Sequence, residues 1–362
     1  MSKKRSSNAP SHEQLVKEVN RIDRDLVKLM NERAKATEQL ARAADGEGLN
    51  SQDVESPLAT LIGASRGPLT ERALQATFRE LVSGCRSLVK SIRVAYLGPL
   101  YSYSYMATIE RFGSSAELIP VSTIAAVFEE LNRGNADYGV VPLENSTDGR
   151  VVDTLGMFAR LPVRICGEVQ LRIHHNLLAK CSRREITEVY SKPQALSQCR
   201  EWLAKHLPNV RMVEMASTAA AAQIAAEKPG AAAVASRLAA TNYGLDFAAE
   251  NIEDNPHNVT RFAVIGGEVA QRTGRDKTAV MFEIPHKPGS LADVMAIFKR
   301  EKLNMTWIES FPLAGGKNEY LFFIELEGHQ ADLKVERAFR LLGKKTVRLE
   351  ILGSYSTAEP ID

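Results

Sequence analysis

The sequence predicts a multidomain protein with an all-α helical N-terminal domain, a two-lobed α/β central domain and an α+β C-terminal domain. Its 362 residues exceed the size of one ordinary domain. Apolar residues recur at helical spacing up to about residue 90, whereas from Ile92 they occur in short runs typical of buried strands. The polar segment 271–276 then precedes a third unit. We therefore expect domains at residues 11–91, 92–270 and 277–355.

The N-terminal domain is predicted from two amphipathic helices. The first runs from Ser11 to about Ala44, and the second begins near Pro68, a residue suited to a first helical turn. Residues 45–53 contain glycine and asparagine and predict a break. Long helices with an apolar stripe favour packing against a second copy, so we expect a homodimer or homotetramer. The stripe of the first helix is Leu15, Val19, Ile22, Leu26 and Leu29, and that of the second is Leu74, Phe78, Leu81, Cys85 and Leu88.

Composition excludes several classes of partner. A net charge of +2 leaves no excess positive field to hold a polyanion, so nucleic acid is not expected. The 4 cysteines lie far apart, without the paired spacing of a zinc site or a disulfide framework, which fits reduced thiols in a cytoplasmic protein. The basic residues 1–10 are followed by no apolar stretch and do not resemble a secretory signal. No apolar run reaches the ~18 residues that span a bilayer, so no membrane association is expected.

The central region alternates between strand and helix patterns. Apolar runs at 93–97 and 138–142 predict buried strands, and the amphipathic stretch 124–131 predicts a helix between them. Helices expected at 193–207 and 218–226 continue the alternation. The region is long enough for two lobes with a ligand cleft between them.

The C-terminal region predicts a ferredoxin-like unit with the order βαββαβ, which usually binds or pairs rather than catalyses. Its strands are expected at 278–284, 304–310, 320–326 and 347–352, and its helices at 288–300 and 332–342.

Several short motifs resemble one family when they are taken together and in order. In the central domain these motifs are 94–99, 141–149, 175–178, 190–196, 217–219 and 258–262. They resemble the prephenate dehydratase domain, whose fold is two-lobed and periplasmic-binding-protein-like. Residues 287–291 and 308–310 resemble the ACT regulatory domain. The N-terminal helices resemble the all-helical chorismate mutase that precedes the dehydratase in bifunctional bacterial enzymes.

The resemblance implies conversion of prephenate to phenylpyruvate in phenylalanine biosynthesis, without a metal or organic cofactor. Prephenate loses a ring hydroxyl and a ring carboxylate together, so the site needs a proton donor at the leaving oxygen and a grip on two carboxylates. Thr260 matches the family's catalytic threonine, and Ser102 retains a hydroxyl at another family position. Arg261 is expected as a carboxylate clamp or a structural clamp.

Further substrate contacts are expected around these residues. Ser217 and Thr218 precede an alanine-rich helix, where they cap the first turn and leave N–H groups facing an anion. Asn145 and Ser146 supply neutral donors, and Phe262 is expected to wall the site. Glu144 could act as a general acid, and His174 and His175 could bind a metal or act as bases. For all three residues a structural role is favoured.

Two departures from the family pattern keep a second hypothesis open. The first loop reads Gly98-Pro99-Leu100-Tyr101-Ser102, in which Tyr101 replaces a glycine that allows close approach or a positive φ. In the ACT-like motif, Phe311 replaces an arginine. The alternative is a catalytically silent sensor that binds prephenate or phenylalanine. Arogenate, with an amine in place of the keto group, also remains open as substrate.

The C-terminal domain is expected to bind phenylalanine at an interface between two copies. The turns at Gly289, Ser290 and Leu291 present backbone groups to a zwitterion, and Glu309 and Ser310 complete the contact. The alternative is a pure dimerisation unit.

The helical domain is predicted to have lost chorismate mutase activity. Of the family's charged substrate contacts, only Arg33 survives in this alignment. A pocket that works by electrostatics and positioning cannot stabilise a dianion with one cation. Neighbouring cations that could have taken over are Lys17, Lys35 and Arg42. The family's other contact positions hold Val16, Ala44, Ser56, Pro57, Cys85 and Val89.

Overall fold

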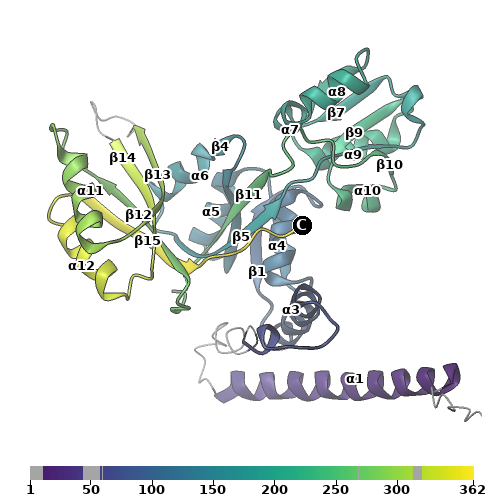
Figure 1. Ribbon diagram of the computed structural model, residues 1–362, viewed down its shortest axis with the longest axis horizontal. Helices are drawn as coiled ribbons and strands as arrows, with labels where there is room; N and C mark the ends of the chain where they lie inside the picture. The colour runs from purple at the N-terminus through teal and green to yellow at the C-terminus, as the bar shows by residue number, and fades with distance from the viewer. Residues whose placement is uncertain (1–10, 44–57, 59, 268, 313–319) are drawn as a thin grey trace, which may run out of the picture. The chain divides into compact units, whose positions relative to one another are not determined.

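The computed structural model describes residues 11–43, 58, 60–267, 269–312 and 320–362 (Figure 1). The chain forms two compact units: one comprises Met1–Ser91 with Gly113–Ser115, and the other comprises Ile92–Phe112 with Ala116–Asp362. The expected tail at 1–10 and break at 45–53 lie outside the described residues, as do Ala44, Ser56 and Pro57. None of the described helices is both long and apolar enough to cross a membrane.

The first unit contains two long helices, α1 (His12–Ala43) and α3 (Glu71–Ser87). The second helix begins at Glu71, three residues after Pro68, because Thr70 caps it: its Oγ1 accepts the N–H of Ala73 at 3.2 Å. Leu88 follows the end of α3 and is exposed, contrary to expectation. The predicted stripe on α1 is exposed along its length, with 59% exposure at Leu29.

The first lobe of the second unit is a sheet of order β2-β1-β3-β11-β5, with β4 paired to β3. Side chains alternate between its two faces. Val94 and Tyr96 pack with α4 (Tyr103–Phe112), whereas Ala95 packs with α5 (Ile124–Asn132) and α6 (Val152–Phe158). The strands are β1 (Arg93–Leu97), β2 (Glu117–Val121), β3 (Tyr138–Asn145), β4 (Gly149–Arg150), β5 (Arg164–Arg172) and β11 (Val259–Gly266).

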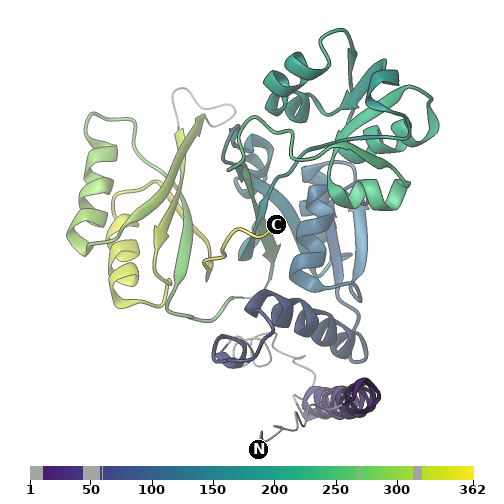
Figure 2. The ribbon, with the colours of Figure 1, turned by 45° about the vertical axis from the view of Figure 1, so that its right-hand side comes forward.

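The second lobe is a sheet of order β10-β6-β9-β7-β8 (Figure 2). Two segments connect the lobes, one between β5 and β6 and the other between β10 and β11. The helix expected at 193–207 is two helices, because the chain leaves helical geometry at Cys199. The strands are β6 (Asn176–Ala179), β7 (Glu188–Ser191), β8 (Arg211–Glu214), β9 (Ala231–Ala235) and β10 (Asp246–Ala249); the helices are η1 (Arg183–Glu185), α7 (Pro193–Gln198), α8 (Arg200–His206), α9 (Thr218–Glu227) and α10 (Arg237–Tyr243).

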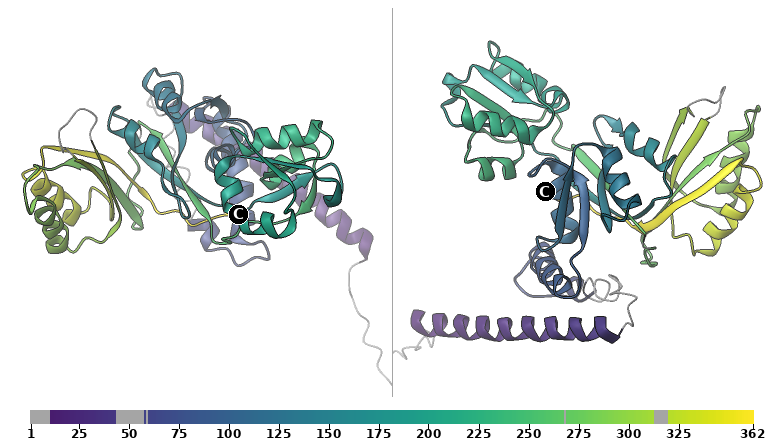
Figure 3. Two further views of the ribbon diagram at one scale, coloured as in Figure 1. Left: turned by 90° about the horizontal axis from the view of Figure 1, so that it is seen from above. Right: turned by 180° about the vertical axis from the view of Figure 1, so that it is seen from behind.

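The C-terminal sheet has the order β13-β14-β12-β15, and its elements follow the expected order βαββαβ (Figure 3). On one face Val280 and Phe282 pack against α11 and α12. On the other face Met281 and Phe323 share a core with Phe158 of the first lobe. The elements are β12 (Asp276–Glu283), α11 (Ser290–Glu301), β13 (Met305–Pro312), β14 (Tyr320–Glu327), α12 (Leu333–Leu342) and β15 (Arg348–Ser356).

Two further contacts join the C-terminal sheet to the first lobe. Gly353 on β15 adopts φ +146, and a Cβ built there would lie 2.0 Å from the carbonyl oxygen of Ile165 on β5. Beyond β15 the chain returns to the same strand, where Ile361 forms a parallel bridge with Leu171. The C-terminal domain is therefore packed against the first lobe rather than attached by a linker alone.

Candidate active site at the junction of the two lobes

Polar segments from three strands meet at one edge of the first-lobe sheet. The parallel strands β1 and β3 both end there, at Leu97 and Asn145. Because β11 runs antiparallel to β3, its first residues lie at the same edge, and Thr260 is the register partner of Asn145. The carboxyl ends of parallel strands are the usual location of ligand sites in open α/β sheets.

Asn145 holds the hydroxyl of Thr260. Its Nδ2 donates to Thr260 Oγ1 at 2.8 Å and to Asn258 Oδ1 at 2.9 Å. Its Oδ1 accepts the N–H groups of Thr147 and Asp148, each at 3.0 Å, which fixes the orientation of the amide. Since the Thr260 oxygen accepts a hydrogen bond, its own proton is left to be donated to another group.

Residues of the second lobe extend this network. Gln198 at the end of α7 donates from Nε2 to Asp148 Oδ2 at 2.6 Å. Its Oε1 accepts from Asn258 Nδ2 at 2.9 Å and contacts His175 Nε2 at 2.8 Å. Burial lowers the pKa of His175, so the ring is neutral near pH 7. Because the amide oxygen of Gln198 can only accept, Nε2 carries the ring proton. These contacts support the structural role favoured for His175. Sequence reasoning missed Gln198 and Asn258 as site residues, although both lie in or beside quoted motifs.

Ser217 and Thr218 lie at the start of α9, as the sequence predicts. Ser217 is the N-cap, and its Oγ accepts the N–H of Ala220 at 3.0 Å. Thr218 follows in the first turn and is only 9% exposed. The parallel strands β7, β8 and β9 all end on this edge of the second-lobe sheet, and each is followed by a helix. This edge meets the first lobe, because Ser236 at the start of α10 donates to the carbonyl oxygen of Tyr101 at 3.5 Å.

The serine hydroxyls of the first lobe bind the backbone. Ser102 Oγ accepts the N–H of Tyr105 at 3.2 Å and donates to the carbonyl of Leu97 at 3.3 Å, so it caps α4. Ser146 Oγ accepts the N–H of Val259 at 2.9 Å, which pins the start of β11 beside the end of β3. Neither hydroxyl is hydrogen-bonded to Thr260.

Arg261 and Phe262 lie apart from the hydroxyl of Thr260. Arg261 points from the opposite face of β11 and binds the carboxylates of Glu144 at 2.8 Å, Glu168 at 3.0 Å and Glu325 at 2.8 Å. This arrangement supports its structural alternative. Phe262 is 2% exposed in the core beneath α4, so in the structure it is a core residue and not a wall of the site.

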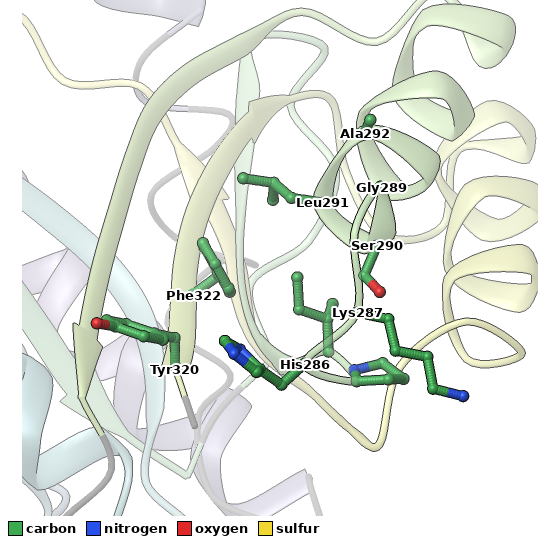
Figure 4. A pocket seen from close by; sticks show the side chains of 10 residues that line it. His286, Lys287, Gly289, Ser290, Leu291, Ala292, Tyr320 and Phe322 are labelled. Carbon is green, nitrogen blue, oxygen red and sulfur yellow. The ribbon is translucent and has the colours of Figure 1, made fainter. Parts of the chain in front are cut away.

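A separate cavity of ≈ 290 Å³ lies in the C-terminal domain. Figure 4 shows Leu291 at the start of α11 facing Phe322 of β14. Gly289 is the N-cap of α11, in left-handed geometry, and no side chain caps this helix. The lining residues are Ile284, Pro285, His286, Lys287, Gly289, Ser290, Leu291, Ala292, Tyr320 and Phe322.

The structure does not bring Glu309 and Ser310 to this cavity. Both lie on β13, the outer strand of the sheet, and neither lines the cavity. Glu309 instead forms an ion pair with Arg150 of β4, and Ser310 is the register partner of Phe322. Within one copy of the chain, the expected five-residue contact is therefore reduced to the turn at Gly289, Ser290 and Leu291.

The family model and the curated relative both indicate prephenate dehydratase. The sequence model of the prephenate dehydratase family matches residues 94–270. A bifunctional chorismate mutase/prephenate dehydratase of Aquifex aeolicus is 41% identical over 353 residues, covering 95% of this chain and 98% of that protein. A prephenate dehydratase from Arthrobacter aurescens, solved in complex with L-Phe, has a TM-score of 0.70 and 33% identity over 75% of this chain and 92% of its own. A protein described as a quorum-quenching acylase has a TM-score of 0.67 and 27% identity over 74% of this chain and 98% of its own.

Proposed function

We propose, since the chain belongs to the family of bifunctional chorismate mutase/prephenate dehydratases, that residues 92–270 convert prephenate to phenylpyruvate. A fold of this kind also carries other activities, so the proposal rests on the site. The observation that carries it is the hydrogen bond from Asn145 to Thr260, which holds a hydroxyl ready to donate at the lobe junction. Neutral donors and the N-terminus of α9 suit a dianionic substrate.

The proposed reaction requires one proton transfer. Thr260 donates a hydrogen bond to the ring hydroxyl as its C–O bond breaks. That oxygen leaves as water after taking the hydroxyl proton of Thr260, which solvent water then replaces. The ring carboxylate leaves as carbon dioxide, and the electron pair of its C–C bond completes the aromatic ring. The bond from Asn145 polarises the Thr260 hydroxyl and strengthens it as a donor. Positioning and proton donation together supply the acceleration, without oxidation or reduction.

The substrate carboxylates are proposed to contact the second-lobe edge. The first turn of α9, beginning at Ser217 and Thr218, offers backbone N–H groups and a positive helix end. Ser102, Ser146 and Asn145 remain proposed contacts from the first lobe, although their hydroxyl or amide groups already hold neighbouring backbone or side chains.

The activity assay uses the purified full chain with prephenate at neutral pH and follows phenylpyruvate. We expect catalytic turnover, and arogenate offered in parallel measures substrate preference. Prephenate binding by calorimetry without product formation would instead support the silent sensor. If the protein neither bound prephenate nor turned it over, both the dehydratase proposal and the sensor alternative would be contradicted.

We propose that the C-terminal domain is an ACT regulatory domain that binds phenylalanine. The uncapped start of α11 suits the carboxylate of an amino acid, and Leu291, Tyr320 and Phe322 offer an apolar wall for its ring. The L-Phe complex of the Arthrobacter aurescens structure supports the same ligand. Inhibition of turnover is the expected consequence.

The binding test compares two exposed leucines of the C-terminal domain. Leu291→Arg places a bulky charge in the cavity and should abolish the calorimetric signal with phenylalanine. Leu333→Arg, at a site 72% exposed and outside the cavity lining, should preserve it. Absence of heat with the unaltered protein would favour the pure dimerisation unit.

We propose that the helical unit serves for assembly and does not convert chorismate. Val16 is exposed and Cys85 is buried at positions where the family carries polar contacts. Arg33, the surviving cation, has Nη1 buried without a hydrogen-bond partner among the described residues, but one cation alone cannot stabilise a dianion. The exposed stripe of α1 supports a homodimer or homotetramer. Catalytic conversion of chorismate to prephenate by the purified protein would contradict the loss of activity.

A further inference from the structure

Two successive residue pairs on β3 and β11 face opposite sides of the sheet. Thr260 pairs with Asn145 and Arg261 pairs with Glu144, and both pairs are also joined by side-chain hydrogen bonds of 2.8 Å. The register shifts between Arg261 and Phe262, so a β-bulge lies directly beside these pairs. Bulges of this kind re-aim side chains next to functional sites. Arg261 and Thr260 are thus one peptide unit apart on the same strand, with their side chains on opposite faces.

Arg261 links this part of β11 to the C-terminal sheet. Its Nη2 binds Glu168 of β5 at 3.0 Å and Glu325 of β14 at 2.8 Å. The guanidinium carbon lies 5.6 Å from the ring centre of Trp307 on β13. Both carboxylates are almost fully buried, with 1% exposure at Glu168 and 0% at Glu325. Because Nη2 of Arg261 binds both carboxylates, the position of the guanidinium group depends on the position of the Glu325 carboxylate.

The C-terminal domain fixes that carboxylate in turn. The hydroxyl of Tyr355 on β15 donates to Glu325 Oε1 at 2.6 Å. Burial raises the pKa of Tyr355, so the hydroxyl remains a donor. Buried ion pairs contribute little net stability, but breaking one by removing a partner is costly, so such pairs are geometrically demanding. The arrangement of Glu325, Tyr355 and Arg261 is therefore specific rather than adaptable.

A second ion pair reaches the same place. Glu309 of β13 binds Arg150 of β4, and Arg150 is the register partner of Glu144. The preceding residue of β4, Gly149, is the register partner of Asn145. The C-terminal sheet thus contacts β11 directly through Arg261 and reaches β3 through its partner strand β4. Strand β14 also carries Phe322 of the cavity described above.

We propose that Arg261 is a positioning residue through which Glu325 and Tyr355 of the C-terminal sheet set the position of Thr260. The proposal rests on the proposed dehydratase function and adds the route of its regulation. Phenylalanine at the cavity acts on β14, β14 carries Glu325, and Glu325 holds Arg261. A ligand that moves this strand changes the geometry of the donor hydroxyl and leaves the second-lobe contacts to the substrate unchanged.

The test is a double-mutant cycle on the full chain. Glu325→Gln keeps the shape and removes the charge, and we expect kcat to fall about 2- to 30-fold, the range for residues that couple sites, with KM unchanged. In a Thr260→Ala background the same substitution should cause no further loss, because the group being positioned is absent. Equal losses in both backgrounds, or an unchanged kcat in the single variant, would overturn the proposal.

A second, more conservative variant tests the proposal in case Glu325→Gln fails to fold. Tyr355→Phe removes only the hydroxyl that holds Glu325 and should show the same dependence on Thr260. Tyr96→Phe is the matched control, since Tyr96 is also fully buried but its hydroxyl has no hydrogen-bond partner among the described residues. We expect Tyr96→Phe to leave kcat unchanged. A fall as large as that of Tyr355→Phe would show a general effect of hydroxyl removal and contradict the proposal.

The assays separate this inference from the proposed function. If the unaltered protein does not turn over prephenate, the dehydratase proposal fails. If it does and Thr260→Ala is impaired, additive losses in the cycle reject only the role of Arg261. Phenylalanine adds an independent readout: Glu325→Gln should still bind it with heat while its kcat no longer responds.

Discussion

The ring of Tyr101 lies edge-on to the ring of Tyr243, with centroids 5.8 Å apart and an interplanar angle of 89°. Tyr101 follows β1 of the first lobe, whereas Tyr243 ends α10 of the second, so the pair joins the two lobes. Tyr101 has φ +65, in the left-handed region that glycine adopts without strain. The family's glycine position is thus occupied by a residue that keeps the glycine-like backbone and adds a contact between lobes.

Tyr101→Gly is expected to raise KM for prephenate about 2- to 10-fold. Loss of an edge-to-face pair costs about 0.5–1.5 kcal/mol, and here that pair favours approach of the lobes around the substrate. Thermal stability should change little, because relief of about 1 kcal/mol of left-handed strain offsets the lost contacts. Tyr101→Phe keeps the ring and should keep KM. A KM that is equal in both variants would show that the ring has no role in substrate binding.

Thr260→Ala should reduce kcat about 100-fold or more, the usual contribution of a positioned proton donor. The variant loses both the donor and the acceptor of the Asn145 bond. Thr260→Ser retains the hydroxyl and should remain within about tenfold of the unaltered protein. Initial rates of phenylpyruvate formation at saturating prephenate measure both. Full activity in Thr260→Ala would remove this residue from the mechanism.

The stability of the protein should fall as the pH drops from 7 toward 5 because of His175. Burial lowers the folded-state pKa of this histidine below its ordinary value of 6.5. The unfolded chain therefore binds more protons below about pH 6.5, and the free energy of unfolding decreases by at most about 1.4 kcal/mol per pH unit. The pKa of Glu168 lies below 4.5, since Arg261 and Lys277 outweigh its burial, so its contribution is lost only at lower pH.

Denaturant titrations of two variants check this assignment. His175→Gln should flatten the dependence of unfolding free energy on pH between 7 and 5. His206→Gln is the control. Slight desolvation and the neighbouring Arg183 and Lys205 also lower the pKa of His206, but the residue is exposed, so removing it should leave most of the pH dependence in place. An unchanged slope in His175→Gln would assign the effect to other groups.

Gly353→Ala should destabilise the second unit by more than about 2 kcal/mol. The added Cβ would lie 2.0 Å from the Ile165 carbonyl oxygen, so β15 and β5 must separate. Gly244→Ala is the matched control, because Gly244 also has a positive φ of +61 but no atom within 4 Å of an added Cβ. Its cost should be about 1–2 kcal/mol from backbone conformation alone. Calorimetric melting of both variants measures the difference.

Local features were predictable from the sequence, because they depend on residues close together in the chain. The cap at Ser217 followed from its immediate neighbours. The partner of Arg261 did not, since Glu325 is 64 residues away and its contact depends on how two sheets pack. The expected place of Phe262 in the wall of the site differs from the structure for a related reason. Strand alternation puts its side chain on the same face of β11 as Thr260, but that part of the face is covered by α4.

Another site contact was hidden by an irregular helix. The sequence predicts one helix over 193–207, whereas the chain breaks at Cys199, and Gln198 at the end of α7 contacts residues of both lobes. Periodicity alone does not reveal such a break, because the apolar spacing continues across it.

The shared core makes the C-terminal domain unsuitable as an exchangeable cassette. Met281, Phe323 and Tyr355 are 0% exposed against the first lobe and would be opened to water by a cut in the segment 271–276. Recombination within this segment would place a foreign C-terminal domain against a first-lobe surface that is complementary to the native C-terminal sheet. Chimaeras that retain function are therefore expected only when the first lobe and the C-terminal sheet are inherited together.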